Sequence, residues 1–490
     1  MAQRGDTLAR WRYLGNAALT RRWACAFLGV LLAACNHLGK PPEVQAPPPR
    51  AAAPAPTPAS QAPPTPPATA TPTPPATATP APVVVPPTPP PPPTPANAEP
   101  ARSPARATEQ PVVVGLLLPL SGPARPLGMA MQRAAEIAFF DLAGPRLTLR
   151  FYDTGGTAEG ANTATRAALD AGAELLLGPV FAPAVRAAAD TRGDAAVPIL
   201  AFSNDAPVAG DGVFILGPRP EEQIARVLSH AADQGVRRLG VFLPANLYGD
   251  LVRETVAALA PQLGISVTRT AFFEPGAPDA PQKIRVFADF PRRKAALQAE
   301  RKALAGRSDA ISKRALKRLE GLDSLGDPPY EAVLLPVGGA ELRRLAPHFA
   351  YYDIDPRRVR YLGTALWNDP TLSTEPALRS GVFAALSPDN GQPFKERYQK
   401  AFDTPPPGLA ALAFDAVSLA AVLQLSADPV AATAFTLPRL TQAGGFSGVT
   451  GLFRLLPNGL NQRGLALMTI TADGLDTLDP APSRFDDLTN

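Results

Sequence analysis

Few residues in this 490-residue chain carry the chemistry of a catalytic or metal site. Its three histidines, His37, His230 and His348, are scattered and never stand at a spacing typical of metal ligands. The two cysteines, Cys25 and Cys35, both lie in an N-terminal stretch that does not look globular. The folded part therefore offers no thiol nucleophile and no cysteine metal site. We expect no metal, no cofactor and no Ser-His-Asp chemistry.

Paired carboxylates can serve general acid and base catalysis, and Asp353 and Asp355 form such a pair. They stand in the turn-like stretch YYDIDP, where aspartates are more commonly solvated or cap a turn. We therefore predict that the chain is not an enzyme.

A hydroxyl group follows the first apolar run of the folded part. Residues Val112–Leu118 are β-branched and then leucine-rich without alternation, which is typical of a strand buried on both faces of a parallel sheet. The next turn holds Ser121 and Gly122, and an amphipathic helix then continues to Leu142. Open α/β sheets bind ligands just past the carboxyl ends of their strands. The loop at Ser121 and Gly122 is therefore the first candidate ligand site.

The rest of the folded part alternates between strands and helices. The predicted strands cover 147–152, 174–177, 198–202, 213–216, 238–243, 266–272, 332–335, 360–362, 382–385, 448–455 and 465–471. The predicted helices cover 158–171, 183–191, 221–234, 250–263, 341–349 and 405–425. This order favours an α/β fold with parallel sheets. One sheet with that many strands would be large, so we expect two Rossmann-like lobes with a change near residues 217–221.

The first 34 residues look like a secretory signal. A basic region precedes an apolar stretch at 23–34, and Leu32-Ala33-Ala34-Cys35 is similar to a bacterial lipobox. In that interpretation Cys35 is lipidated and becomes the new N-terminus. The alternative is an ordinary signal peptide that contains a cysteine. Asn36 follows, rather than the aspartate that favours inner-membrane retention in enteric bacteria, so we expect a lipid anchor on the periplasmic side of the outer membrane.

Residues 35–111 are predicted to form a disordered tether. From 41 to 111, 28 of 71 residues are proline, and such a segment favours polyproline II and cannot bury a core. Fully extended at about 3.1 Å per residue, it would reach on the order of 200 Å. The alternative to a plain spacer is a docking role for its PxxP stretches.

Charge is unevenly distributed along the chain. The net charge is +4, but the first 34 residues carry five arginines and one aspartate, so the remainder is formally neutral. General attraction to nucleic acid therefore has no basis. Residues 283–320 hold twelve Lys and Arg against four acidic residues, which we interpret as an insertion of two short basic helices. They form either a solvated face or a contact for an acidic partner or an anionic surface. The candidate partner-binding residues are Arg301, Lys302, Arg307, Lys313, Arg314, Lys317 and Arg318.

Several segments together resemble the type I periplasmic binding proteins, in particular their leucine-binding branch. In chain order they are VVVGLLLPLSGP, AELLLGPVFAPAV, VPILAFSND, RRLGVFLPANLYGDLV, ALAFDAVSLAAVL and FSGVTGLFRLLPNG. The stretch YYDIDPRRVRYLGTALWND and the basic insertion are further similar to the penicillin-binding protein activators, lipoproteins of the LpoA/LppC group. The resemblance covers about residues 112–475.

That resemblance implies two lobes around a cleft, joined by three crossings that we place near Gly217, Ser387 and Phe446. The first lobe is then 112–218 with 388–445, and the second is 219–387 with 446–478, followed by a tail at 479–490. The candidate cleft-lining residues that the resemblance implies are Ser121, Gly122, Gly178, Pro179, Ala182, Phe202, Ser203, Asn204, Tyr248 and Gly249.

One loop bears on the expected ligand. In amino-acid receptors of this family, the loop after the Gly178-Pro179 position supplies a serine hydroxyl for the ligand carboxylate, whereas this chain has Phe181 and Ala182 there. An α-carboxylate needs converging donors, so amino-acid binding is not favoured. We therefore predict a non-enzymatic, periplasm-facing lipoprotein that regulates peptidoglycan synthesis by binding a bifunctional penicillin-binding protein. The alternative is a solute-binding receptor, for an amino acid or other small polar ligand, of an ABC-type importer or sensor.

Overall fold

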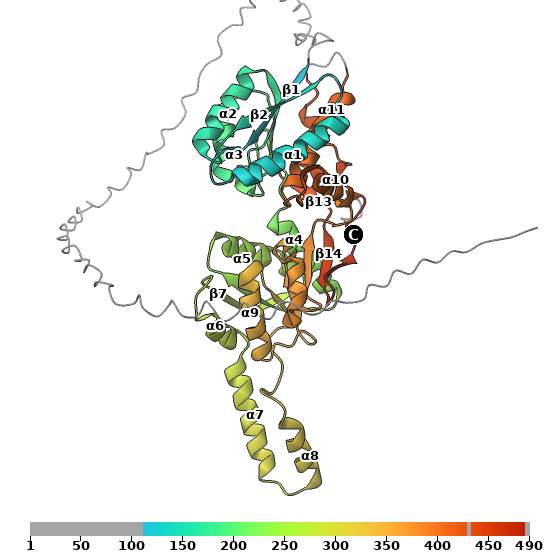
Figure 1. Ribbon diagram of the computed structural model, residues 1–490. Helices are drawn as coiled ribbons and strands as arrows, with labels where there is room; N and C mark the ends of the chain where they lie inside the picture. Colours follow the sequence, from blue (N-terminus) through green and yellow to red (C-terminus); the bar gives the residue numbers. More distant parts are fainter. Residues whose placement is uncertain (1–110, 429–432, 486–490) are drawn as a thin grey trace, which may run out of the picture. The chain divides into compact units, whose positions relative to one another are not determined.

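The computed structural model describes residues 111–428 and 433–485 of the chain (Figure 1). The predicted signal segment, the predicted lipidation site Cys35 and the predicted tether up to residue 110 lie outside these residues, as does the end of the predicted tail. None of the described helices has both the length and the apolar character needed to cross a membrane.

The first lobe is built on a sheet of five parallel strands in the order β2-β1-β3-β4-β5. The strands are β1 Val112–Leu118, β2 Leu147–Asp153, β3 Ala173–Leu177, β4 Ile199–Ala201 and β5 Val213–Ile215. The helices are α1 Arg125–Leu142, α2 Ala158–Asp170 and α3 Ala182–Arg192, with the 3-10 turn η1 Ala206–Val208. The predicted bounds of β1 are confirmed. Its neighbours β2 and β3 flank it, so β1 is an interior strand of the sheet.

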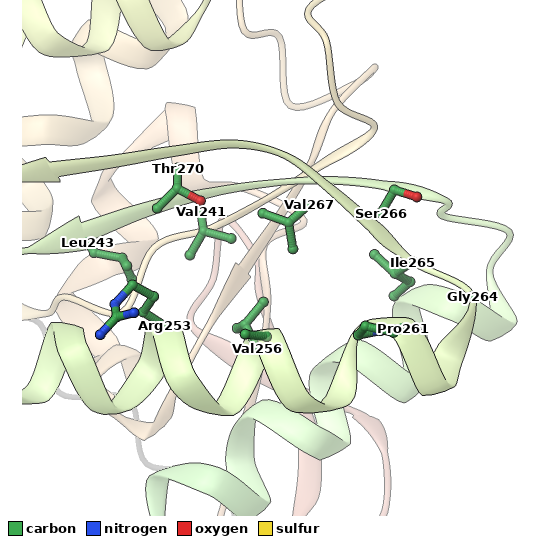
Figure 2. A pocket seen from close by; sticks show the side chains of 11 residues that line it. Val241, Leu243, Arg253, Val256, Pro261, Gly264, Ile265, Ser266, Val267 and Thr270 are labelled. Atoms are coloured by element: carbon green, nitrogen blue, oxygen red, sulfur yellow. The ribbon is translucent and has the colours of Figure 1, made fainter. Parts of the chain in front are cut away.

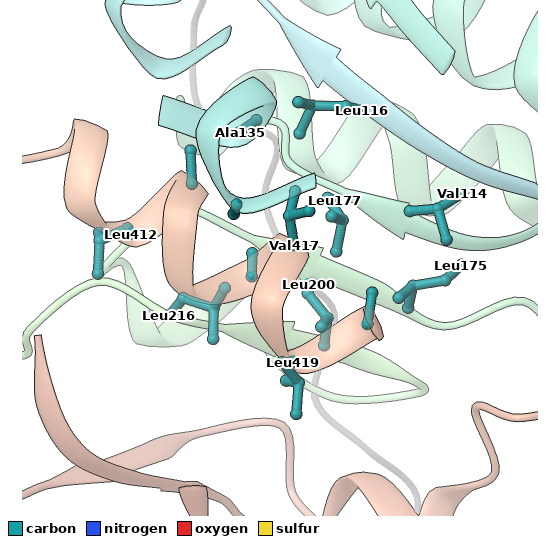
Figure 3. Close-up of a cluster of buried hydrophobic side chains, with 14 of the residues drawn as sticks. Val114, Leu116, Ala135, Leu175, Leu177, Leu200, Leu216, Leu412, Val417 and Leu419 are labelled. Carbon is teal, nitrogen blue, oxygen red and sulfur yellow. The ribbon is translucent and has the colours of Figure 1, made fainter. Parts of the chain in front are cut away.

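Both faces of this sheet are covered by helices. Leu116 of β1 packs in the cluster that includes α1, whereas the next residue, Leu117, packs in the cluster that includes α2 and α3. The first cluster also receives α11, Ala410–Leu425, a helix that is apolar on nearly all sides and buries Val417 and Leu419 (Figure 3). Burying one such leucine or valine side chain contributes about 1.5–3 kcal/mol, so a helix formed far along the chain becomes part of the first lobe.

The second lobe holds a sheet of seven strands in the order β15-β14-β10-β9-β8-β6-β7. Its strands are β6 Arg238–Pro244, β7 Ser266–Phe273, β8 Ala332–Leu334, β9 Arg360–Gly363, β10 Val382–Ala385, β14 Ala466–Ile470 and β15 Leu475–Asp479. Strands β6 to β10 run parallel, and β14 and β15 are antiparallel additions at one edge. The helices are α4 Pro220–Asp233, α5 Leu247–Leu259, α6 Ala280–Phe287 and α9 Gly339–Tyr351, with 3-10 turns η2 Pro261–Leu263, η3 Ala365–Trp367, η4 Pro370–Thr374 and η5 Pro376–Leu378.

The late part of the chain differs from the predicted layout. Strands β11 Phe446–Gly448, β12 Gly451–Leu455 and β13 Asn461–Arg463 form a small separate sheet. Phe453 and Leu455 of β12 are buried in the α1–α11 core cluster of the first lobe, whereas β14 and β15 join the larger sheet. The crossing that we expected at Phe446 therefore lies after β13. Tertiary packing explains this difference, because the alternating apolar residues of β12 are buried in the core of the first lobe.

Two further helices complete the first lobe. They are α10 Gln392–Phe402 and the short α12 Leu437–Leu440. Phe394 and Tyr398 of α10 pack with Ala134 and Ile137 of α1. The return of the chain after β10 to the first lobe therefore follows from burial of the aromatic face of α10.

The predicted basic insertion is a helical hairpin, α7 Phe290–Ala305 and α8 Ala310–Leu319, which extends away from the second sheet (Figure 1). It begins later than residue 283, because Ile284 and Phe287 of α6 are buried in the core of the second lobe. The carboxylate of Asp309 accepts the backbone N–H of Ser312 at 2.9 Å, so Asp309 caps α8.

Candidate functional site

The loop after β1 is held by a carboxylate from the end of β2. One carboxylate oxygen of Asp153 accepts the backbone N–H groups of Leu120 at 2.8 Å, Ser121 at 3.1 Å and Gly155 at 2.8 Å. Burial acts to raise the pKa of Asp153, but a hydrogen bond from the Ser121 side chain and these backbone bonds outweigh it and lower the pKa. The Ser121 loop is thus held by the end of β2. Gly122 adopts a positive φ of 71° that the turn requires.

The loop after β3 shows an aromatic side chain. Gly178 approaches the carbonyl oxygen of Leu117 so closely that an added Cβ would lie 2.3 Å from it. The Gly178-Pro179 bond is cis, and the Pro179 carbonyl accepts the Phe202 N–H at 2.9 Å. Phe181 is 38% exposed, and Ala182 begins α3. No hydroxyl stands at Phe181 or Ala182, in agreement with the sequence.

The loop after β4 is only partly available to a ligand. Phe202 is 2% exposed and belongs to the core cluster of the first lobe, so it does not line a surface. Ser203 is buried, and its hydroxyl accepts the Asp205 N–H at 3.1 Å. Asn204 is exposed. Of the three residues predicted here, Asn204 presents the accessible polar group.

In the second lobe the predicted Tyr248 meets polar groups that the sequence did not reveal. Its hydroxyl bonds to the hydroxyl of Thr364, which follows β9, at 3.1 Å. Burial raises the pKa of Tyr248, the bond to Thr364 opposes this, and the charge of Glu221 adds to the rise. The side chain of Gln223, on α4, accepts the backbone N–H of Ala365, the residue after Thr364, at 2.8 Å. The carboxyl ends of β6 and β9 and the start of α4 therefore meet at one polar site.

Gly249 has a structural role beside Tyr248. An added Cβ would lie 1.9 Å from the carbonyl oxygen of Pro244, the last residue of β6. Its N–H donates to the Asn246 side chain at 3.0 Å, which caps α5. Glycine at this position therefore lets the helix start close to the strand end, and so places Tyr248.

The segments that connect the lobes are joined by Arg463 and Asn461. The Arg463 guanidinium, 3% exposed, donates to the carbonyl of Leu216 at 3.0 Å and to the Thr450 hydroxyl at 2.9 Å. Asn461 donates to the carbonyl of Gly217 at 2.8 Å. The residues just after β5 and those of β13 are therefore held together by buried hydrogen bonds.

Buried carboxylates complete this connection. Asp415 of α11 accepts the N–H groups of Val449 at 2.7 Å and Thr450 at 2.9 Å, and also the Thr450 hydroxyl. Burial raises the pKa of Asp415. Burial also lowers the pKa of Arg463 to about 10, although the negative charges of Asp415 and Glu222 oppose this shift. Burial also raises the pKa of Glu222 to about 7, although Arg219 and Arg463 oppose it. The sole sequence signal was one aspartate, Asp415, inside the apolar stretch ALAFDAVSLAAVL.

A hollow of about 510 Å³ lies apart from these loops, between α5 and the strands β6 and β7 (Figure 2). A register shift opposite Leu239 and Gly240 lets both Val267 and Thr270 of β7 line it. Arg253 is its charged residue and already pairs with Asp250 at 3.6 Å and with Glu254. Its walls are mostly aliphatic. The residues that line this hollow do not favour a charged ligand.

The candidate partner-binding cations fall into two groups. Arg301 donates to the carbonyls of Leu319, Glu320 and Leu322, at 2.5, 3.1 and 3.0 Å, and so closes the end of α8. Its role in the fold corrects the prediction that it is free for a partner. The other six, Lys302, Arg307, Lys313, Arg314, Lys317 and Arg318, are exposed.

The carboxylates of the YYDIDP stretch pair with arginines. Asp353 accepts from Arg293 at 2.8 Å and from the Ser324 hydroxyl, and Asp355 binds Arg357 at 2.7 Å. Across residues 111–428 and 433–485, no group of three or more His, Cys, Asp or Glu side chains is placed to hold a metal ion.

Comparisons with known proteins agree with this architecture. A family model described as "Periplasmic binding protein" matches residues 111–475. A putative branched-chain amino acid ABC transporter protein from Rhodospirillum rubrum is 17% identical, with a TM-score of 0.59 over 75% of this chain and 100% of that chain. An ABC transporter substrate-binding protein from Desulfitobacterium hafniense, solved in complex with Leu, is 16% identical, with a TM-score of 0.53 over 75% of this chain and 100% of that chain.

A third solved structure is the solute-binding protein of an ABC transporter from Rhodopseudomonas palustris BisB5, in complex with 3,4-dihydroxy benzoic acid. It is 15% identical, with a TM-score of 0.51 over 76% of this chain and 96% of that chain. A search of curated proteins returns no match. Since the family model spans both sheets and the segments between them, the chain belongs to the periplasmic binding protein family and has its two-lobed type I fold.

Proposed function

We propose that the chain is an extracytoplasmic solute-binding protein that takes a small polar ligand at the loops following its parallel strands. The observation that carries this proposal is the polar site at the ends of β6 and β9, where the partly exposed Tyr248 bonds to the buried Thr364, next to the buried Gln223. Ligands of α/β sheets bind outside the carboxyl ends of the strands. The Ser121 loop, ordered by Asp153, is the corresponding feature of the first lobe.

The ligand differs from a plain α-amino acid in this proposal. At Phe181 and Ala182 a half-exposed ring and a methyl group replace the hydroxyl that would hold an α-carboxylate. A ring at this position favours a ligand with an apolar or aromatic part, because the burial of apolar surface is favourable and unmet donors are costly.

Thermal unfolding with a panel of amino acids, aromatic acids and muropeptides tests the proposal. A ligand at about 100 times its Kd should add about 2.7 kcal/mol of stability. The double variant Tyr248→Phe with Thr364→Val should lose that response, whereas Thr163→Val, on an exposed face of α2, should keep it. No stabilisation by any member of the panel would argue against this function.

The second candidate function is regulation of a bifunctional penicillin-binding protein. The absence of a hydroxyl at Phe181 and Ala182 also favours this function. A cleft that no longer binds a solute can be retained because its shape serves binding to another protein. In this function Cys35 carries a lipid anchor in the outer membrane and the Pro-rich segment spans the distance to the cell wall. Capture of solubilised penicillin-binding proteins by the chain, beyond capture by a control lipoprotein, would support it; equal capture would count against it.

A further inference from the structure

The basic hairpin is attached rigidly to the second lobe. Arg293 of α7 is 2% exposed and pairs with Asp353 at 2.8 Å. Asp353 also accepts the Ser324 hydroxyl, and the N–H of Leu325 donates to the Arg293 carbonyl at 3.0 Å. With Arg301 closing the end of α8, the hairpin presents its remaining cations in a preorganised arrangement.

Those remaining cations lie without an ion-pair partner in the part of the chain that the structure describes. Lys302, Arg307, Lys313, Arg314, Lys317 and Arg318 form no ion pair among the residues that the structure describes. On α8, Lys313 lies four residues before Lys317, and Arg314 lies four residues before Arg318. Like charges at this spacing repel and destabilise an isolated helix. An anionic partner would relieve this repulsion.

The exposed face of α8 combines charge with an apolar side chain. At about 100° per residue, its four cations spread over an arc of about 140°, opposite the face that packs on α7. Ile311, 78% exposed, borders this arc close to the tip of the hairpin. A shallow hollow of about 580 Å³ is lined by Ile311, Arg314, Lys317 and Arg318.

We propose that this face of α8, together with Arg307 at the hairpin tip, docks onto a membrane surface rich in anionic phospholipid. The guanidinium and ammonium groups pair with lipid phosphates, and Ile311 lies among the glycerol and upper acyl carbons. A broad arc of cations fits a surface whose anionic lipids diffuse to meet it. The arc lacks the buried aromatic anchors typical of protein interfaces, which counts against an acidic protein as the partner.

The expected affinity follows from charge counting. Each Lys or Arg near an anionic membrane strengthens binding about fivefold. Reversal of three cations should therefore weaken binding by more than about a hundredfold. Added salt should also weaken binding, because the Debye length falls from about 10 Å at 0.1 M to about 3 Å at 1 M.

The test uses the full chain with Cys35→Ser, so that no lipid on that residue can anchor it, and sedimentation with vesicles. Mixed phosphatidylglycerol and phosphatidylethanolamine vesicles should bind the chain at low salt, and pure phosphatidylcholine vesicles should not. The variant R314E/K317E/R318E should lose binding. The matched variant R150E/R166E/K395E reverses three exposed cations of the first lobe, so its total charge changes by the same amount. This variant should retain binding to the vesicles. Ile311→Ser should weaken binding several-fold without changing its salt dependence.

Thermal unfolding of each variant checks that the fold is retained. The proposal is overturned if the chain fails to sediment with anionic vesicles at low salt, or if both triple variants bind equally well. It is also overturned if soluble polyglutamate binds as tightly as the vesicles with the same loss in R314E/K317E/R318E, because the partner is then an acidic polypeptide. These results are independent of the solute-binding test, since no residue of α8 lies in the loops after the strands.

Discussion

The arginines where the lobes connect and those on the basic hairpin behave in opposite ways. Arg463 is buried and binds a carbonyl, a hydroxyl and, at 5.0 Å, the ring of Phe453. Arg314 and Arg318 are exposed on a helix among other cations. A buried arginine with all its partners in the chain serves the fold, whereas an exposed one without partners is available for binding. The same residue type therefore marks a structural core in one region and a docking surface in the other.

The largest expected effect comes from Arg463→Met. This change leaves the buried Asp415 and the partly buried Glu222 without their compensating charge, and it leaves the carbonyl of Leu216 without its donor. We expect a loss of about 3–5 kcal/mol in the free energy of unfolding, measured by urea denaturation. The matched change Arg318→Met should alter stability by less than about 0.5 kcal/mol. Similar losses for both variants would remove the distinction between the two regions.

Arg293→Met should cost about 2–3 kcal/mol, because it breaks a largely buried ion pair with Asp353. Hydrogen exchange should speed up in α7 and α8 more than in the two sheets. The adjacent Arg292→Met is the control, since that side chain is exposed and pairs locally with Asp289. Unchanged exchange in the hairpin would show that Arg293 does not anchor it.

The raised pKa of Glu222 predicts that the stability of the fold depends on pH. Its folded-state pKa of about 7 lies above its usual value of 4.5, so the folded state binds the proton more tightly than the unfolded state does. The contribution to the free energy of unfolding is complete below pH 4.5 and is lost as the pH rises through about 7, with a total of about 3 kcal/mol. Unfolding measured from pH 4.5 to 8 should show this decline against Glu222→Gln, which should lack it. Parallel curves for both proteins would contradict the prediction.

A smaller effect is expected for Tyr248→Phe. It removes the hydroxyl that bonds to the buried Thr364, at a cost of about 1 kcal/mol in unfolding free energy. Thr364→Val should cost a similar amount, and the double variant should cost less than the sum, since the two changes remove one shared bond. Full additivity would mean that the two hydroxyls act separately.

Much of the fold was predictable because its signals are local. The uninterrupted apolar run of β1 and the strand–helix alternation each follow from a few neighbouring residues. The third crossing was placed wrongly, because residues 446–455 can pack on either lobe and only the burial of Phe453 and Leu455 decides. The basic helices were predicted from composition, but their start depended on Ile284 and Phe287, whose burial is tertiary.

The candidate site was only partly predictable. The loops of Ser121 and Tyr248 remain predicted cleft-lining loops, and the structure adds the polar partners that surround them. Their partners Asp153 and Thr364 follow other strands, so neighbouring sequence gives no sign of the pairing. Arg463 was missed because a charged residue is by default read as exposed. Phe202 was misplaced because its position beside a polar Ser-Asn pair hides its burial in the core.

The most direct test of the solute-binding function is hydrogen exchange with and without the best stabilising compound from the thermal panel. Binding at the strand-end loops predicts slower exchange at residues 120–124, 181–184 and 247–250, in both lobes together. Protection confined to the hollow under α5, or to the hairpin of α7 and α8, would contradict it.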